Sequence, residues 1–211
     1  MLKVGIIAEG TTDQAVLINI LKGALNVQRE DIVLIRPELK FDKTDFANLR
    51  QLGGWESVKR DCEDGEAIRI FFESELVDEQ RILIIQVDTA ELQHTHDKTN
   101  TITYCQTLRD EVINTIKTWL SFSCERFYYA VCIEEMDAWI LPLYQARDSV
   151  KSAKPKEKLC AVLKGKYRED DKCYKEISND FRKLKNLQAC YPHNESLHLF
   201  IESLQALPAN E

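Results

Sequence analysis

The stretch Val4-Gly5-Ile6-Ile7-Ala8-Glu9-Gly10-Thr11-Thr12-Asp13 opens the chain with an apolar run that stops at a glutamate. The apolar run predicts a buried strand, and Gly10 predicts a tight turn after it. The helical spacing of apolar residues through Ile20 and Leu21 then predicts a capped helix. A carboxylate at the carboxyl end of a parallel strand lies where α/β folds bind their ligands. Glu9 is therefore a candidate site residue, and on this stretch alone a solvated turn residue is an equal alternative.

Strand-like and helix-like segments alternate along the first two thirds of the chain. We expect strands at residues 2–8, 32–35, 81–87 and 127–133, and late helices at about 156–163, 173–187 and 196–204. This alternation predicts an α/β fold, with a mostly parallel four-stranded sheet flanked by helices and a helical C-terminal region. We assign residues 1–147 to the α/β domain and residues 148–211 to a helical C-terminal extension packed on it.

Composition and charge narrow the class of protein. The chain has 211 residues, of which 44% are hydrophobic and 30% charged, as in ordinary globular domains. It shows neither a signal peptide nor an apolar run that would span a membrane, so we expect a cytoplasmic protein without membrane contact. The seven cysteines form no C-x-x-C pair and are expected to be free thiols.

The net charge of −7 argues against a surface coated in positive charge for indiscriminate nucleic-acid binding. It remains compatible with a nuclease, because a two-metal site needs carboxylates and a local basic face can coexist with an acidic total. Basic residues do concentrate between Lys151 and Lys185. Acidic residues are interleaved with them, which favours a solvated helical surface over a binding face.

Acidic residues follow three of the four predicted strands: Glu9 the first, Asp88 the third, and Glu134, Glu135 and Asp137 the fourth. In a parallel sheet these ends share one edge, so Glu9 and Asp88 converge if their strands are neighbours. Converging carboxylates repel each other unless a cation screens them, and hard oxygen ligands favour Mg²⁺ or Mn²⁺. The pattern indicates phosphoryl transfer or phosphodiester hydrolysis. A separation of more than roughly 10 Å between the Glu9 and Asp88 carboxylates would exclude a two-metal site. The alternative is a set of acids that begin solvated loops.

These segments together resemble the motifs of the Toprim superfamily. Residues 6–13, Ile-Ile-Ala-Glu-Gly-x-x-Asp, are similar to its first motif, and residues 84–91 resemble its second, a strand leading to Asp-x-Asp. Residues 134–141 resemble an acidic segment of small Toprim-like proteins that are linked to phage defence and to overcoming-lysogenization-defect nucleases. The second motif departs from the pattern at Ala90, where an aspartate is expected, and Glu91 follows one residue later.

The resemblance covers roughly residues 1–145 and implies roles for the site residues. Glu9 would act as general acid/base near the scissile phosphate, and Asp88 would be the second catalytic residue. The implied ligands of Mg²⁺ or Mn²⁺ are Glu9, Asp88, Glu91, Glu134 and Asp137. We expect substrate contacts from Gly10, Asp13, His94 and His96. For the last two, a solvated loop is the alternative.

The function expected from this resemblance is Mg²⁺-dependent cleavage of phosphodiester bonds in RNA or DNA, as an effector in phage defence. Such an effector would have a partner ATPase or another defence-system protein, and the chain would form a homo-oligomer. Ala90 keeps a second possibility open, a catalytically impaired Toprim-like module for interaction or regulation. A third is a small metal-dependent phosphohydrolase.

Overall fold

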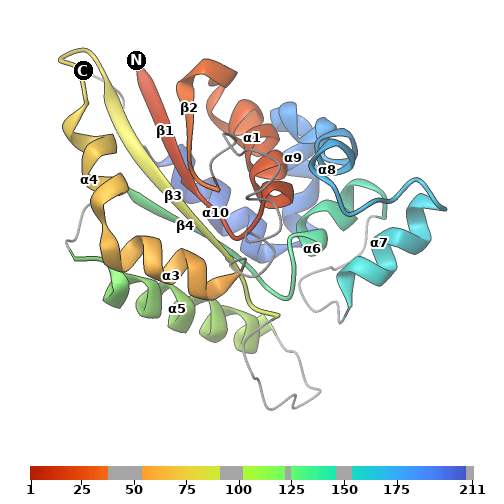
Figure 1. Ribbon diagram of the computed structural model, residues 1–211. Helices are drawn as coiled ribbons and strands as arrows, with labels where there is room; N and C mark the ends of the chain where they lie inside the picture. Colours follow the sequence, from red (N-terminus) through yellow and green to blue (C-terminus); the bar gives the residue numbers. More distant parts are fainter. Residues whose placement is uncertain (38–53, 91–101, 122–124, 146–153, 208–211) are drawn as a thin grey trace, which may run out of the picture.

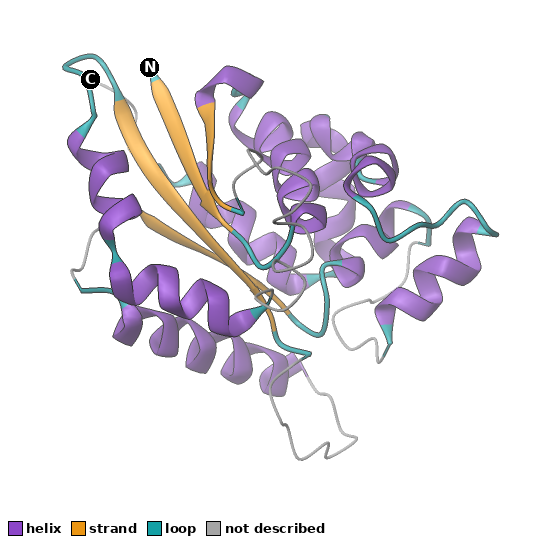
Figure 2. Cartoon of the chain, viewed as in Figure 1, coloured by secondary structure: helices purple, strands orange, loops and turns teal. Residues whose placement is uncertain are grey.

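The computed structural model describes residues 1–37, 54–90, 102–121, 125–145 and 154–207. These residues form an α/β structure around one sheet of four parallel strands, in the order β2-β1-β3-β4 (Figure 1). The strands are β1 (Leu2–Ile7), β2 (Ile32–Arg36), β3 (Gln80–Asp88) and β4 (Phe127–Cys132). Helices flank the sheet on both faces and form the whole described C-terminal region (Figure 2), which confirms the predicted fold class.

Two sets of helices cover the two faces of the sheet (Figure 1). One face carries α3 (Trp55–Asp64), α4 (Glu66–Glu73) and α5 (Ile102–Trp119). The other carries α1 (Thr11–Leu25), α8 (Asp171–Ile177), α9 (Leu184–Cys190) and α10 (Glu195–Gln205). The short α6 (Asp137–Ile140) follows β4 and contacts α7 (Pro155–Leu163). Single 3-10 turns are η1 (Arg29–Asp31), η2 (Leu141–Leu143), η3 (Asn179–Arg182) and η4 (Tyr191–His193).

The sheet is buried on both faces because successive side chains of a strand point to opposite sides. In β3, Ile82 and Ile84 join the core under α1, whereas Leu83 and Ile85 join the core under α5. The continuous apolar run of this strand thus supplies apolar side chains to both faces of the sheet, each of which is covered by helices. Within the described ranges, no helix is long and apolar enough to cross a membrane.

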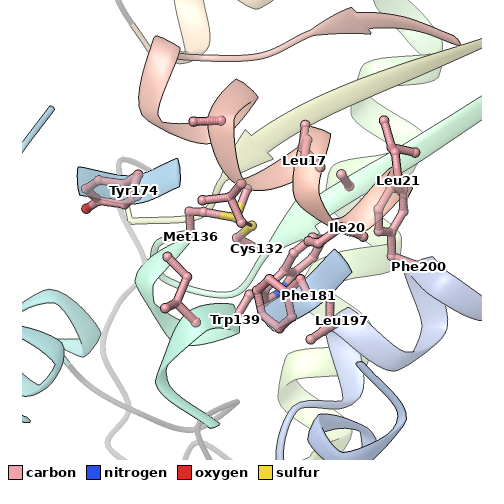
Figure 3. Close-up of a cluster of buried hydrophobic side chains, with 14 of the residues drawn as sticks. Leu17, Ile20, Leu21, Cys132, Met136, Trp139, Tyr174, Phe181, Leu197 and Phe200 are labelled. Carbon is pink, nitrogen blue, oxygen red and sulfur yellow. Dashed lines mark hydrogen bonds between the residues drawn. The ribbon is translucent and has the colours of Figure 1, made fainter. Parts of the chain in front are cut away.

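The C-terminal helices pack into the same core as α1 and the sheet (Figure 3). Trp139 of α6 is fully buried, stacks on Phe200 with ring centroids 5.4 Å apart, and donates from Nε1 to Ser196 Oγ at 3.0 Å. Ser196 Oγ in turn donates to the Val131 carbonyl of β4 at 2.6 Å. The last helix is thereby bonded to the strand that carries the predicted acidic segment. The domain boundary at residue 147 stays a prediction, because it falls outside the described residues.

Replacement of Gly23 by alanine should destabilise the protein, although the same change stabilises an exposed helix by about 1 kcal/mol. Gly23 lies where α1 meets η3, and a Cβ there would lie 1.9 Å from the Phe181 carbonyl oxygen. We expect a loss of about 3 kcal/mol in the free energy of unfolding, measured with urea. The reverse change Ala67→Gly on the exposed side of α4 is the control, with an expected cost of about 1 kcal/mol. A stabilised Gly23→Ala protein would contradict this close helix packing.

Candidate functional site at the carboxyl edge of the sheet

The strand order brings Glu9 and Asp88 together. Strands β1 and β3 are neighbours, and Ile7 pairs with Ile85 in their register. Glu9 therefore begins its loop beside the end of β3, where its Oε1 accepts a hydrogen bond from the Asp88 backbone N–H at 2.6 Å. Because that N–H belongs to Asp88 itself, the two carboxylates lie inside the roughly 10 Å limit set for a two-metal site.

A buried glutamine ties the two strand ends together. The Gln86 side chain is inaccessible to solvent, its Oε1 accepts from the Glu9 backbone N–H at 3.1 Å, and its Nε2 donates to Asp88 Oδ1 at 2.8 Å. The sequence interpretation missed Gln86. The signal was nevertheless present, since a polar residue inside an otherwise apolar, doubly covered strand has to find hydrogen-bond partners.

Asp88 lies half-buried among other acids. Its Oδ2 accepts from the Met136 backbone N–H at 3.3 Å. Burial, followed by the negative charges of Asp13 and Glu9, raises the pKa of Asp88 well above its usual value, and the Met136 hydrogen bond offsets only part of this. The site therefore holds more negative charge at this edge than its own hydrogen bonds compensate.

Asp13 is the second buried acid of the cluster. It lies in the first turn of α1, with 7% of its surface exposed. Burial and the charge of Asp137 raise the pKa of Asp13 to about 7, against the lowering effect of backbone hydrogen bonds at Gly10 and at Asp13 itself. Gly10 leaves room for this carboxylate, because a Cβ at that position would lie 3.2 Å from Asp13 Oδ2. Two of the four residues predicted to contact substrate thus lie beside each other, and the charge of one of them, Asp13, acts on Asp88.

The C-terminal region reaches the site through two tyrosines. Asp137 is buried, and both its oxygens accept from the Tyr174 hydroxyl, at 3.0 and 2.9 Å. The Tyr167 hydroxyl contacts Asp137 Oδ1 at 3.1 Å and the Tyr174 hydroxyl at 2.6 Å. Burial still raises the pKa of Asp137 despite these two donors. Asp137 is therefore close to the cluster, but its oxygens are already hydrogen-bonded to protein.

Glu134 takes an unusual backbone conformation beside the position where the second motif departs from its pattern. Its φ is 66°, in the left-handed region that non-glycine residues seldom adopt. The Glu134 N–H donates to Thr89 Oγ1 at 2.8 Å, and its carbonyl accepts from the Ala90 N–H at 3.0 Å. Such strained residues persist where neighbouring bonds fix them, and they cluster at functional sites. Ala90 itself is exposed and supplies no carboxylate.

A lysine from the helical C-terminal region also faces the acids. Lys156, at the start of α7, forms an ion pair with Glu169 at 3.1 Å. The negative charges of Glu169, Glu135 and Asp137 raise the pKa of Lys156 above its usual value despite the opposing effect of burial. Sequence interpretation did not single out this lysine, because only the fold places α7 beside the segment after β4.

Three predicted site residues lie outside the described residues: Glu91, His94 and His96. Their roles stay predictions.

The donors present suit Mg²⁺ in kind, because Glu9, Asp13 and Asp88 offer only hard oxygen ligands. Among the residues that the structure describes, no group of three or more His, Cys, Asp or Glu side chains is arranged to hold a metal ion. Glu9 Oε1 and both Asp88 oxygens accept hydrogen bonds from protein donors. Mg²⁺ is commonly bound by one or two carboxylates and keeps several of its waters. Glu9 and Asp88 would therefore be sufficient ligands, once the Gln86 side chain releases Asp88 Oδ1.

Comparison of the chain with protein-family models, with curated proteins and with solved structures gave no match.

Proposed function

We propose that this chain is a Mg²⁺- or Mn²⁺-dependent nuclease of the Toprim type, which cleaves phosphodiester bonds of RNA or DNA. The observation that carries the proposal is the convergence of Glu9, Asp13 and Asp88 at the carboxyl edge of a parallel sheet, with raised pKa values for both aspartates. Acids held together in this way gain stability from a bound cation. Acids that only begin a loop would be exposed to solvent, whereas Asp13 is buried.

The residues would divide the chemistry between them. Glu9 and Asp88 would hold Mg²⁺, whose charge stabilises phosphoryl oxygens and lowers the pKa of a bound water. Glu9 would act as general acid/base, oriented by its hydrogen bond to the Asp88 N–H. The N-terminus of α1, which follows Gly10, would bind a phosphate oxygen of the substrate through its backbone N–H groups. Tyr174 and Tyr167 would position Asp137 and through it the segment after β4.

Ala90 supports a second candidate function. It removes one carboxylate from the second motif, and its N–H is bonded to Glu134. A catalytically impaired module for interaction or regulation would tolerate that loss. A role in phage defence, an ATPase or other defence-system partner, homo-oligomer formation and a cytoplasmic location stay predictions.

A cleavage panel distinguishes the two functions. The full chain is incubated with end-labelled single-stranded and duplex RNA and DNA, in Mg²⁺, in Mn²⁺ and in EDTA. We expect fragments of at least one substrate with metal and none in EDTA. Intact substrates under every condition would contradict the nuclease and favour the interaction module.

A further inference from the structure

A groove runs along α1 away from the carboxylate edge. It has a volume of about 330 Å³, and one wall is a stripe of α1 that includes Thr11, Ile18 and Lys22. These residues follow one another at helical spacing, so the groove accompanies the helix for about 16 Å at ~1.5 Å per residue. Its first residue, Thr11, is two positions after Glu9. The groove thus starts on the first turn of the helix that follows Glu9.

The charged residues that line this groove are mainly cationic. Lys22, Arg29, Lys175 and Arg182 line it, against one acid, Asp171. They come from α1, from η1 before β2, and from α8 and η3, so the fold gathers them from distant parts of the sequence. Across the described ranges, neither Lys22 nor Lys175 is held in an ion pair. Their charge is therefore available to a ligand.

Two further cavities continue the groove across α8. The first, of about 440 Å³, shares Lys175 and Arg182 with it and adds Lys172, with Glu176 as its acid. The second, of about 530 Å³, also contains Lys172 and adds Lys166 and Arg168, with Asp170 and Glu176 as its acids. A chain with a net charge of −7 has thus collected cations along one continuous path.

A fully buried asparagine orients the arginine at the centre of this path. Asn19 Oδ1 accepts from Arg182 Nε at 2.7 Å. Asn19 Nδ2 donates to the Lys175 carbonyl at 2.9 Å and to Ser178 Oγ at 2.8 Å, which fixes the amide. This bond uses Nε alone, and Arg182 lines the groove, so the two terminal nitrogens of its guanidinium keep their donors for a ligand. An arginine held in this way is suited to bind a phosphate oxygen pair.

Resting on the proposed nuclease function, we infer that this path, the α1–α8 groove, binds the phosphate backbone of one strand of the substrate nucleic acid and leads it from the carboxylate edge. The first 16 Å along α1 matches about five stacked nucleotides at ~3.4 Å each, more than a mononucleotide spans. The lining residues Ala15, Ile18 and Leu34 are apolar and offer no base-reading groups. The amide nitrogen of Gln14, which also lines the groove, is bonded to the Arg36 and Pro37 carbonyls. Binding should therefore be independent of sequence and strongly dependent on salt.

Binding is tested in a Glu9→Gln background, so that the strand is not cleaved. Fluorescence anisotropy measures the affinity for labelled oligonucleotides of about 20 residues over a range of salt concentrations. The variant Lys22→Gln/Lys175→Gln removes two groove charges whose side chains form no ion pair among the described residues. The control Arg69→Gln/Lys117→Gln removes two charges from exposed positions on α4 and α5, across the sheet. Melting curves confirm that both proteins are folded.

We expect the groove variant to bind about 20-fold more weakly near 0.1 M salt, with a salt slope reduced by about 1.5, and the control to match its parent. Unchanged binding by the groove variant, absence of binding by its parent, or equal competition by a mononucleotide and the oligonucleotide would overturn the inference. Cleavage by the wild-type chain is measured in parallel. Cleavage with groove-independent binding refutes the groove alone, whereas groove-dependent binding without metal-dependent cleavage refutes the nuclease alone and leaves the groove supported.

Discussion

Replacement of Glu9 by glutamine should reduce metal-dependent cleavage by about 1,000-fold, the range expected when a general acid/base is removed. The change is nearly isosteric. Glutamine keeps an oxygen at the position of Oε1, so it preserves the hydrogen bond from the Asp88 N–H and the folded structure. It removes the negative charge and the proton acceptor. The loss should therefore appear in kcat rather than in the melting temperature.

The matched control for this experiment is Glu66→Gln, which neutralises an exposed acid in the first turn of α4. It should cleave at the wild-type rate. Cleavage that survives Glu9→Gln would contradict the proposed mechanism and point to a nuclease contaminant or to another site on the chain. An unfolded Glu9→Gln protein would be seen by circular dichroism, and Glu9→Asp then tests the role of the carboxylate position.

Metal-free protein should become more stable as the pH falls from about 8 to about 5, in contrast to most proteins. The reason is Asp13, whose pKa is raised from 3.8 to about 7 by burial and by Asp137. Below pH 3.8 the folded and unfolded chains both carry the proton and there is no penalty. Between those two pKa values the folded state binds more protons, so stability falls as the pH rises, and above about 7 the full penalty applies.

Asp13→Asn isolates this contribution. The penalty from Asp13 is on the order of 4 kcal/mol, so the variant should melt about 10 °C above wild type in EDTA near pH 8, with a much smaller pH dependence. Mg²⁺ should stabilise wild type at that pH more than the variant. Thermal melts over the pH range measure both effects, with the exposed Asp64→Asn as control. A variant less stable than wild type at pH 8 would show that the buried charge is already compensated in the protein.

The sequence predicted the sheet and the edge where the acids meet because both depend on local patterns. A continuous apolar run predicts a strand that is covered on both faces. Because parallel strands all end at the same edge of the sheet, an acid that follows such a strand is expected at that edge. The proximity of Glu9 and Asp88 depended on one further fact, the adjacency of β1 and β3, which the strand order supplies.

Contacts between distant segments were beyond sequence reasoning. The Tyr174 hydroxyl bonds to Asp137, and Asn19 bonds to Arg182. These pairs are far apart in the sequence, and the spacing of residues within a helix or strand does not predict such contacts. The helix expected at 173–187 is instead α8, η3 and α9, because Ser178 ends α8 and bonds to Asn19. The basic residues between Lys151 and Lys185 were interpreted as a solvated surface. Several of them line the α1–α8 groove, since the fold places them opposite Lys22 and Arg29.

The central claim, that the carboxylates at the sheet edge bind a divalent cation, is tested most directly by X-ray anomalous scattering from a crystal grown with Mn²⁺. We predict an anomalous peak between the Glu9 and Asp88 carboxylates, within about 2.2 Å of an oxygen of each, with Gln86 turned away from Asp88. An edge without a peak at a saturating Mn²⁺ concentration, with Gln86 still bonded to Asp88, would contradict the account.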